Sequence, residues 1–206
     1  TGDIAIDGSA DEDAWSQATW IENFGQPWLK SGKQPGTTAT RAKLLWDRTH
    51  LYVFAELEDH DLFAAVTEHD GRTWSDDVFE LFLKPADDKP GYYEFQVNAA
   101  GTVLDMFLPQ RKPNGYELYR SDGDFRVESH VLRKGTLNDH ADEDRGWSVE
   151  FRIPWTDFMR TGGRPVPDER WKFALCRYDY SSDRARPIVS QHLTYSSKPP
   201  PNFHRY

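Results

Sequence analysis

The fold is most readily deduced from Trp74-Ser-Asp-Asp-Val-Phe-Glu-Leu-Phe-Leu-Lys84. In its second half, large apolar residues occupy alternate positions, as they do in a β-strand whose two faces have different surroundings. Phe79, Leu81 and Leu83 fall on one face and Glu80 falls on the other. The segment therefore predicts a strand that is apolar towards a core and carries a carboxylate on its opposite face, with an indole just before it.

The same alternation recurs along the chain, in short runs separated by Gly, Pro, Asn and Asp. Nine short strands of this kind predict an all-β fold, an antiparallel β-sandwich with jelly-roll or immunoglobulin-like layers. The predicted strands are Ala42–Trp46, Leu51–Glu58, Val78–Lys84, Tyr92–Asn98, Thr102–Leu108, Phe125–Leu132, Trp147–Ile153, Trp171–Tyr178 and Ser190–Tyr195.

Hairpin turns are predicted at Trp46–His50 and Asn98–Gly101, where turn-forming residues join two predicted strands. Helical signals are brief. Asp11–Gln17 predicts one or two turns after an acidic cap, and Pro154–Phe158 predicts a turn that begins with proline. Long loops are predicted over 23–39 and 136–145.

The composition fits one domain over residues 1–206, which we expect to be a unit of a larger protein. Hydrophobic residues are only 37% of the chain, but 8 Trp, 9 Tyr and 12 Phe supply large buried areas. The net charge of −9 opposes a nucleic-acid partner. No run is long and apolar enough for membrane insertion. The single cysteine, Cys176, excludes an internal disulfide.

Strand parity separates a core face from a polar face. Glu80, Gln96 and Asn98 fall on the polar face of their strands, and Arg177 falls on the core face close to a strand end, where its long side chain is expected to turn its guanidinium into the same cleft. One interpretation is a solvated sheet face. The other is a sugar site, because an indole such as Trp74 stacks on a pyranose while acids, amides and guanidinium groups bind hydroxyls.

Six segments together resemble family 9 carbohydrate-binding modules: 6–15, 42–54, 74–80, 93–101, 146–154 and 201–204. The resemblance implies a β-sandwich that binds glucan or xylan chains, often at a reducing end, between two aromatic side chains. Trp74 matches the first wall and Glu80 the hydroxyl acceptor. For the second wall the chain offers Tyr195 and Phe203, of which Phe203 is the better match; Gln96 and Asn98 lie where further polar contacts are expected.

The family also implies that this chain binds and does not cut, although its parent protein is expected to carry glycoside hydrolase activity and to act in carbohydrate catabolism. The expected location is secreted, periplasmic or on the cell surface, as a monomer or a module of a multidomain protein. Family members carry structural calcium, for which Asp59, Asp61, Asp76 and Asp77 offer oxygen ligands. No catalytic cofactor is expected.

Other interpretations stay open at this stage. The domain could be a structural or protein-interaction sandwich that has lost sugar binding. Phe203 in place of the Trp that the family has near its carboxy terminus is an argument for this interpretation. A haem-binding relative would need an axial Met and His pair, which the sequence does not suggest. Glu80 with Glu94 or Asp105 could form a glycosidase pair, but no spacing selects them. The histidines show no paired spacing, so a zinc site is not expected.

Overall fold

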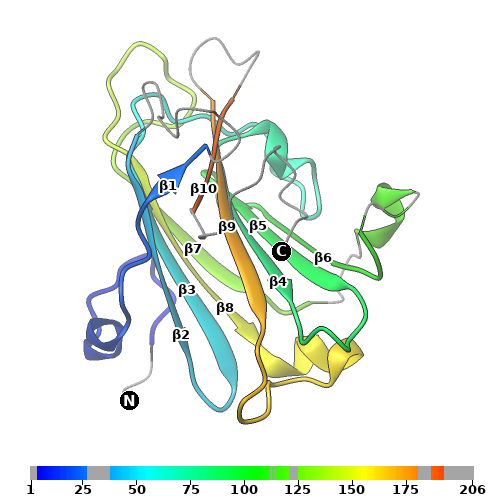
Figure 1. Cartoon of the computed structure of the whole chain (residues 1–206). Coiled ribbons are helices and arrows are strands. Elements are labelled where there is room, and N and C mark those ends of the chain that lie inside the picture. The colour runs from blue at the N-terminus through cyan, green and yellow to red at the C-terminus, as the bar shows by residue number, and fades with distance from the viewer. Residues whose placement is uncertain are drawn as a thin grey trace.

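The structure is a computed structural model that describes residues 4–26, 38–111, 113, 115–120, 125–180 and 187–192. Its strands form two facing antiparallel sheets (Figure 1). Helical structure in these ranges is limited to short 3-10 turns. The elements in chain order are η1 Asp13–Gln17, β1 Phe24–Gly25, β2 Thr40–Trp46, β3 His50–Leu57, η2 Thr73–Ser75, β4 Val78–Lys84, β5 Tyr92–Asn98, β6 Val103–Leu108, η3 Tyr116–Tyr119, β7 Glu128–Arg133, β8 Trp147–Pro154, η4 Trp155–Thr161, β9 Lys172–Asp179 and β10 Ile188–His192.

The larger sheet has the order β1-β10-β9-β4-β5-β6 and the smaller has the order β2-β3-β8-β7, with every pair antiparallel. The predicted sandwich is confirmed, and β4 and β5 have the predicted bounds. The short strand β1 lies inside the predicted loop 23–39. It was missed because two residues carry no alternation signal.

The main core lies between the sheets and contains the predicted apolar faces of the strands. Tyr93 and Phe95 of β5 meet Phe125 and Phe158 edge-on, with ring centroids 4.8–6.1 Å apart. Each fully buried Phe contributes about 1.5–3 kcal/mol relative to an exposed one. The aromatic residues therefore compensate for the low hydrophobic fraction.

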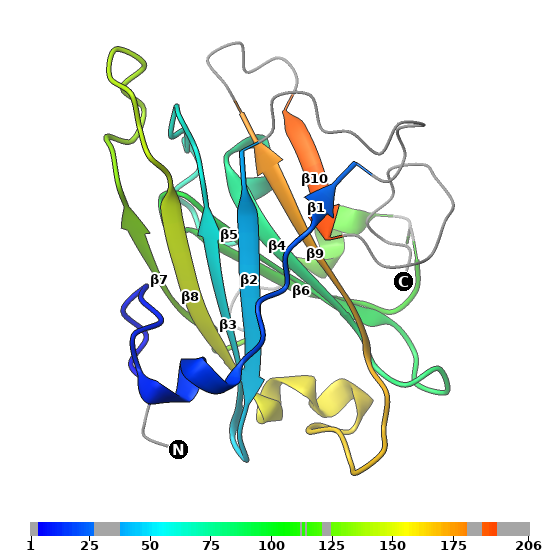
Figure 2. The ribbon, with the colours of Figure 1, turned by 60° about the vertical axis from the view of Figure 1, so that its left-hand side comes forward.

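The amino-terminal segment covers the outer face of the smaller sheet, where η1 lies beside the strands (Figure 2). Trp15 of η1 is fully buried against Phe54, and its indole nitrogen donates a 3.0 Å hydrogen bond to Glu150. This cover explains why β3 and β8 are buried on both faces.

The outer face of the larger sheet is not a solvated face. Glu80, Glu94, Gln96 and Asn98 all point to that side, and each is at most 2% exposed. The loop that carries Trp74 and the turn η3 pack over these side chains. Four polar groups buried together need specific partners or a ligand, which separates this region from an ordinary sheet surface.

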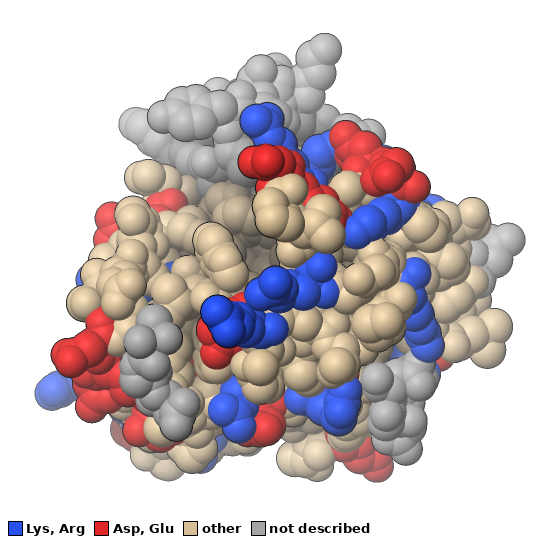
Figure 3. All heavy atoms as spheres, turned by 90° about the horizontal axis from the view of Figure 1, so that it is seen from below, with Lys and Arg blue, Asp and Glu red and all other residues tan. Residues whose placement is uncertain are grey.

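Charges on the surface are mixed. Figure 3 shows Lys and Arg side chains across the middle of one end of the molecule, with Asp and Glu among and around them. This arrangement differs from the continuous basic surface that nucleic-acid backbones require.

None of the helices within the described ranges has the length and apolar composition needed to cross a bilayer.

Candidate functional site

Trp74 is held in place by its neighbours while its side chain stays half-buried. It lies in η2, four residues before β4 begins. The Tyr180 hydroxyl donates to the Trp74 carbonyl at 2.9 Å, and the neighbouring Thr73 hydroxyl donates to Gln96 Oε1 at 2.6 Å. The loop is thereby tied to β5 and to the residue after β9. The indole is presented on an anchored backbone.

Beneath the indole lies a pocket of about 270 Å³. Its floor comes from β4, β5 and β9, and one wall comes from η3. The lining combines aromatic rings with carboxyl and amide groups, which is the mixture expected of a site for a small polar ligand. The lining residues are Trp74, Glu80, Phe82, Glu94, Gln96, Tyr116 and Tyr178.

A chain of hydrogen bonds orders the floor of the pocket. Gln96 accepts from Thr73 and donates through Nε2 to Glu94 Oε1 at 2.7 Å, and the Tyr116 hydroxyl donates to the same oxygen at 2.8 Å. Burial raises the pKa of Glu94 to about 7, and the bonds from Tyr116 and Gln96 oppose that rise. The network fixes the amide and the phenol before any ligand arrives.

Glu80 lies beside this network on the floor of the pocket. It stands between Gln96 on β5 and Cys176 on β9 in the sheet register. Within the described ranges its Oε2 has no hydrogen-bond partner, although the side chain is 2% exposed. Burial, and then the charge of Glu94, raise the pKa of Glu80 well above its usual range. A buried oxygen without a donor is costly, so a ligand hydroxyl that binds here would be favoured.

The indole has two close neighbours at the rim of the pocket. The Tyr116 ring meets Trp74 edge-on, with centroids 6.0 Å apart and planes at 76°. The Arg120 guanidinium carbon lies 6.0 Å from the indole centroid, at the outer limit of a cation–π contact. Tyr116 and Trp74 thus form a corner of aromatic surface.

Three predicted residues meet in this pocket: Trp74, Glu80 and Gln96. Asn98 shares their sheet face, but it lies away from the pocket, at the end of β5. Its amide nitrogen donates to Asp76 Oδ2 at 2.7 Å and to the Val66 carbonyl at 2.8 Å, and its oxygen accepts from two backbone groups of the following turn. All of its hydrogen-bonding groups are engaged in holding loops.

The prediction that Arg177 turns into the cleft is wrong. Its parity was predicted correctly, since it pairs in register with the core residue Phe79. Its guanidinium stays on that side, 3.1 Å from both Asp59 and Asp179, and also donates to the Glu58 carbonyl. A fully buried guanidinium needs carboxylate partners, and these lie on the core side of the sheet.

Tyr195 and Phe203, predicted for the second aromatic wall, lie outside the described residues. The sequence interpretation did not include Glu94, Tyr116 or Tyr178 in the sugar site. Glu94 lies two residues before Gln96 in the same strand, so strand parity does place it on the face of Glu80 and Gln96. Tyr116 carried no usable signal, because it follows β6 in a segment without strand alternation.

The predicted calcium ligands do not form one group. Asp76 accepts hydrogen bonds from Ala65 N, Val66 N and Asn98, and Asp61 pairs with His140. Asp59 and Asp77 do come together, and Asp179 joins them, with ligand oxygens within 4.8 Å of one another.

Burial and mutual repulsion raise the pKa of Asp59 to about 6 and that of Asp77 to about 9. The Arg177 guanidinium pairs with two of the three carboxylates, those of Asp59 and Asp179. The donor set therefore fits a hard cation in oxygen chemistry and in charge.

A larger depression of about 1330 Å³ lies on the outer face of the smaller sheet. It contains Trp20, but Arg41 lies 4.1 Å and Lys43 4.5 Å from the centroid of that indole. The cations contact the ring surface on which a sugar would stack. The smaller pocket under Trp74, with its buried acids and ordered amide, is therefore the better candidate.

Comparison with known proteins gives a consistent result. Exoglucanase XynX of Acetivibrio thermocellus is 26% identical over 170 residues, which are 79% of this chain and 12% of that protein. Two solved structures of a family 9 carbohydrate-binding module from Caldicellulosiruptor kristjanssonii, one with cellotriose and one with glucose, superpose with a TM-score of 0.59 each. They are 20% and 22% identical and cover 92% of this chain, and the alignments span 79% and 81% of those chains.

The chain thus spans about an eighth of the exoglucanase that it resembles. The similarity to the two solved modules establishes the sandwich fold. The model of the family described as "Carbohydrate family 9 binding domain-like" matches residues 6–198, which is nearly the whole sequence. The chain belongs to that family.

Proposed function

We propose that this domain binds carbohydrate without cutting it, and that the pocket under Trp74 holds one sugar residue at the end of a gluco- or xylo-oligosaccharide. The observation that carries the proposal is the pairing of a half-buried indole with a buried carboxyl oxygen, Glu80 Oε2, that has no hydrogen-bond partner among the described residues. A pyranose offers both partners, because its C–H face stacks on an aromatic ring while its hydroxyls donate hydrogen bonds.

The pocket volume favours a chain end over a long internal segment. Its volume of about 270 Å³ lies just below the ~300–1,000 Å³ typical of small-molecule sites. Gln96 and Glu94 add fixed polar groups on the floor, so that hydroxyls on neighbouring ring carbons can be bound together. The solved modules with glucose and cellotriose support this class of ligand.

The proposal extends to the protein that contains the domain. The similarity to a small part of an exoglucanase supports a module within a larger glycan-degrading enzyme, in which the domain would hold the substrate while another part cuts it. Polysaccharide substrates are too large to enter a cell, so we propose a secreted or surface location.

The first prediction concerns Trp74. We expect Trp74→Ala to weaken binding of cellotriose by about 1–3 kcal/mol, or about 5- to 150-fold, because the stacking surface is lost. Isothermal titration calorimetry with cellotriose, glucose and xylotriose measures it. Trp74 is half-buried, so the variant is expected to stay folded, as circular dichroism would verify.

Trp46→Ala is the matched control. Trp46 is 69% exposed and lies outside the pocket, so its loss removes an indole and leaves the proposed site intact. Equal affinity of the two variants for cellotriose would place the sugar elsewhere. Absence of heat from the unmodified chain with all three sugars would favour a sandwich that no longer binds carbohydrate.

The second prediction concerns calcium. We propose that Asp59, Asp77 and Asp179 hold the ion, because the cluster has more carboxylates than cations and a divalent ion would relieve their repulsion. Calcium is expected to raise the melting temperature of EGTA-treated protein, in proportion to the logarithm of its concentration once the site is saturated.

Asp77→Asn should abolish this rise, whereas Asp87→Asn, at a carboxylate outside the group, should not. A melting temperature that is the same in EGTA and in millimolar calcium would contradict the proposal.

A further inference from the structure

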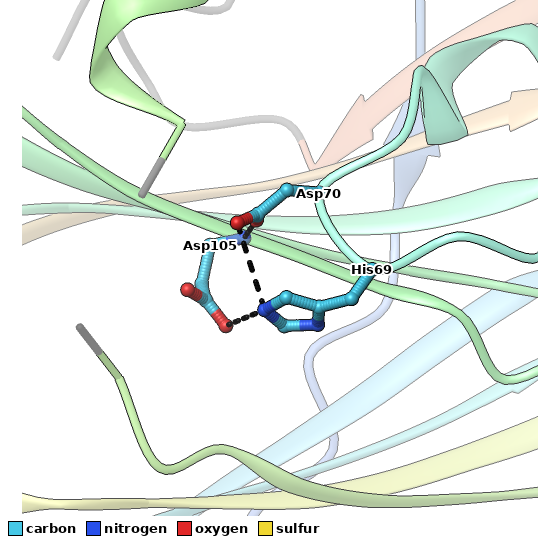
Figure 4. A group of neighbouring side chains, drawn as sticks. All are labelled: His69, Asp70 and Asp105. Atoms are coloured by element: carbon cyan, nitrogen blue, oxygen red, sulfur yellow. Dashed lines mark hydrogen bonds and ion pairs between the residues drawn. The ribbon is translucent and has the colours of Figure 1, made fainter. Parts of the chain in front are cut away.

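A second group of possible metal ligands lies beside the loop that carries Trp74. His69 and Asp70 come from this loop, and Asp105 comes from β6 (Figure 4). His69 Nε2 lies 3.6 Å from Asp70 Oδ2 and 3.7 Å from Asp105 Oδ2, and the three ligand atoms are all within 4.8 Å of one another. The three side chains converge on one small volume, although Asp105 is 35 positions away from Asp70 in the sequence.

The distances in this group fit ligands of a shared ion better than hydrogen bonds. An N···O separation of 3.6–3.7 Å exceeds the ~3.2 Å limit of an ordinary hydrogen bond. Two atoms bound to one tetrahedral zinc at ~2.0–2.1 Å are themselves about 3.4 Å apart. The two His69 separations are therefore close to those of atoms that share one tetrahedral ion.

Both carboxylates are fixed by their surroundings. Asp70 Oδ1 accepts a 3.1 Å hydrogen bond from Asp105 N, and Asp70 N donates to the Val103 carbonyl at 2.9 Å. Asp70 has a φ of 58°, an uncommon conformation for a residue other than glycine, which these bonds maintain. Asp105 is 1% exposed. His69 is 43% exposed in its side chain, so an ion can reach the group from solvent.

We propose that His69, Asp70 and Asp105 form a site for a zinc-type divalent ion, with water completing the coordination. An imidazole nitrogen with two carboxylate oxygens suits zinc and its neighbours in the first transition row, whereas calcium prefers oxygen ligands alone. The absence of a short His-x-His or Cys-x-x-Cys spacing explains why this group could not be recognised in the sequence. The fold brings its members together across a sheet edge.

An ion at this position would brace the sugar pocket, a consequence that rests on the proposed function. Asp70 is four residues before Trp74, and the two are also linked through Arg120. The Arg120 guanidinium donates to the Asp70 carbonyl at 2.7 Å while it lies 6.0 Å from the Trp74 ring. Fixing the loop to β6 would reduce the entropy that the loop loses when a sugar binds.

The test uses the full chain without a polyhistidine tag, treated with chelator and titrated with zinc chloride by calorimetry. We expect one bound zinc ion per chain at this group, and a visible absorption band with cobalt as the spectroscopic substitute. His69→Ala and Asp105→Asn should each weaken zinc binding by at least about tenfold, since even outer-shell losses cost about 10- to 100-fold. His130→Ala, an exposed histidine on β7, is the control and should bind zinc as the unmodified chain does.

The outcomes separate this proposal from the sugar proposal. Because the His69 side chain is half-exposed, His69→Ala is expected to fold even where Asp105→Asn does not, and it decides the question alone. No zinc binding by the unmodified chain, or unchanged binding by His69→Ala, would overturn the metal site whatever the sugar titrations show. Zinc binding without any effect on cellotriose affinity would keep the site and remove its link to the pocket.

Discussion

Replacement of Arg177 by Met is expected to lower the free energy of unfolding by about 3–5 kcal/mol. The guanidinium is 1% exposed and lies 3.1 Å from carboxylate oxygens of both Asp59 and Asp179. It also donates to Thr40 Oγ1 at 3.1 Å and to the Glu58 carbonyl. Removal of this guanidinium would leave several buried acceptors without the donor that they have now, and the carboxylates of Asp59 and Asp179 without their cation.

Urea denaturation in EGTA buffer measures this effect without interference from calcium. Arg41→Met is the matched control, because Arg41 pairs with Glu56 at an exposed position, where both side chains are at least 38% exposed. Such pairs contribute about 0–1 kcal/mol. Asp59→Asn added to Arg177→Met should recover part of the loss, since it removes one of the uncompensated charges.

The same variant tests the correction to the role of Arg177. If the arginine has only a structural role, the folded Arg177→Met protein keeps the cellotriose affinity of the unmodified chain. A variant that stays folded and loses cellotriose binding would return Arg177 to the sugar site, as the sequence had suggested. A loss of stability below about 1 kcal/mol would contradict the structural role.

The sequence predicts those features of the structure that depend on residues close together in the chain. Alternation along β4 and β5 gave their bounds and placed Glu80 and Gln96 on a common face, because side-chain direction in a strand is a local property. The turn between β5 and β6 was also predicted, because turn-forming residues are a local signal. These signals sufficed for the sandwich and for part of the pocket floor.

Other features of the molecule depend on contacts between distant segments. Tyr116 reaches Glu94 from a turn that begins eight residues after β6 ends, and no periodicity marks it. Parity predicted the face of Arg177 but not its partners. A long side chain can extend in several directions, and this one is fixed by Asp59 from the loop after β3 and by Asp179 at the end of β9. The group of His69, Asp70 and Asp105 also depends on a contact between segments that are distant in the sequence.

The covered polar face also has a thermodynamic consequence, which is the last prediction. The chain is expected to lose stability as pH rises from about 4.5 to about 7, in part because of Glu94. Burial raises the pKa of Glu94 from 4.5 to about 7, so over this range the folded chain holds a proton that the unfolded chain has released. The folded state then binds more protons, and its stability falls with rising pH until both states are ionised.

The difference between the two pKa values corresponds to about 3 kcal/mol for this one group. Glu80 acts in the same direction and extends the fall to higher pH, because burial and the charge of Glu94 raise its pKa. Glu150, buried under the amino-terminal segment, adds to it, with a pKa of about 7.

Urea denaturation between pH 4.5 and 8 measures the slope, with Glu94→Gln as the variant. Gln cannot ionise, so the free energy of unfolding of the variant should fall less steeply with pH. The difference in slope should correspond to the uptake of up to one proton fewer by the folded state. Glu169→Gln is the control with the opposite sign. Its ion pair with Lys89 lowers the pKa of Glu169 to about 2, so that contribution is lost only in more acidic solution. Glu169→Gln should therefore shift the curve of unfolding free energy against pH without changing its slope between pH 5.5 and 8. If the slope is also unchanged in Glu94→Gln, Glu94 is already ionised in the folded chain and the prediction is wrong.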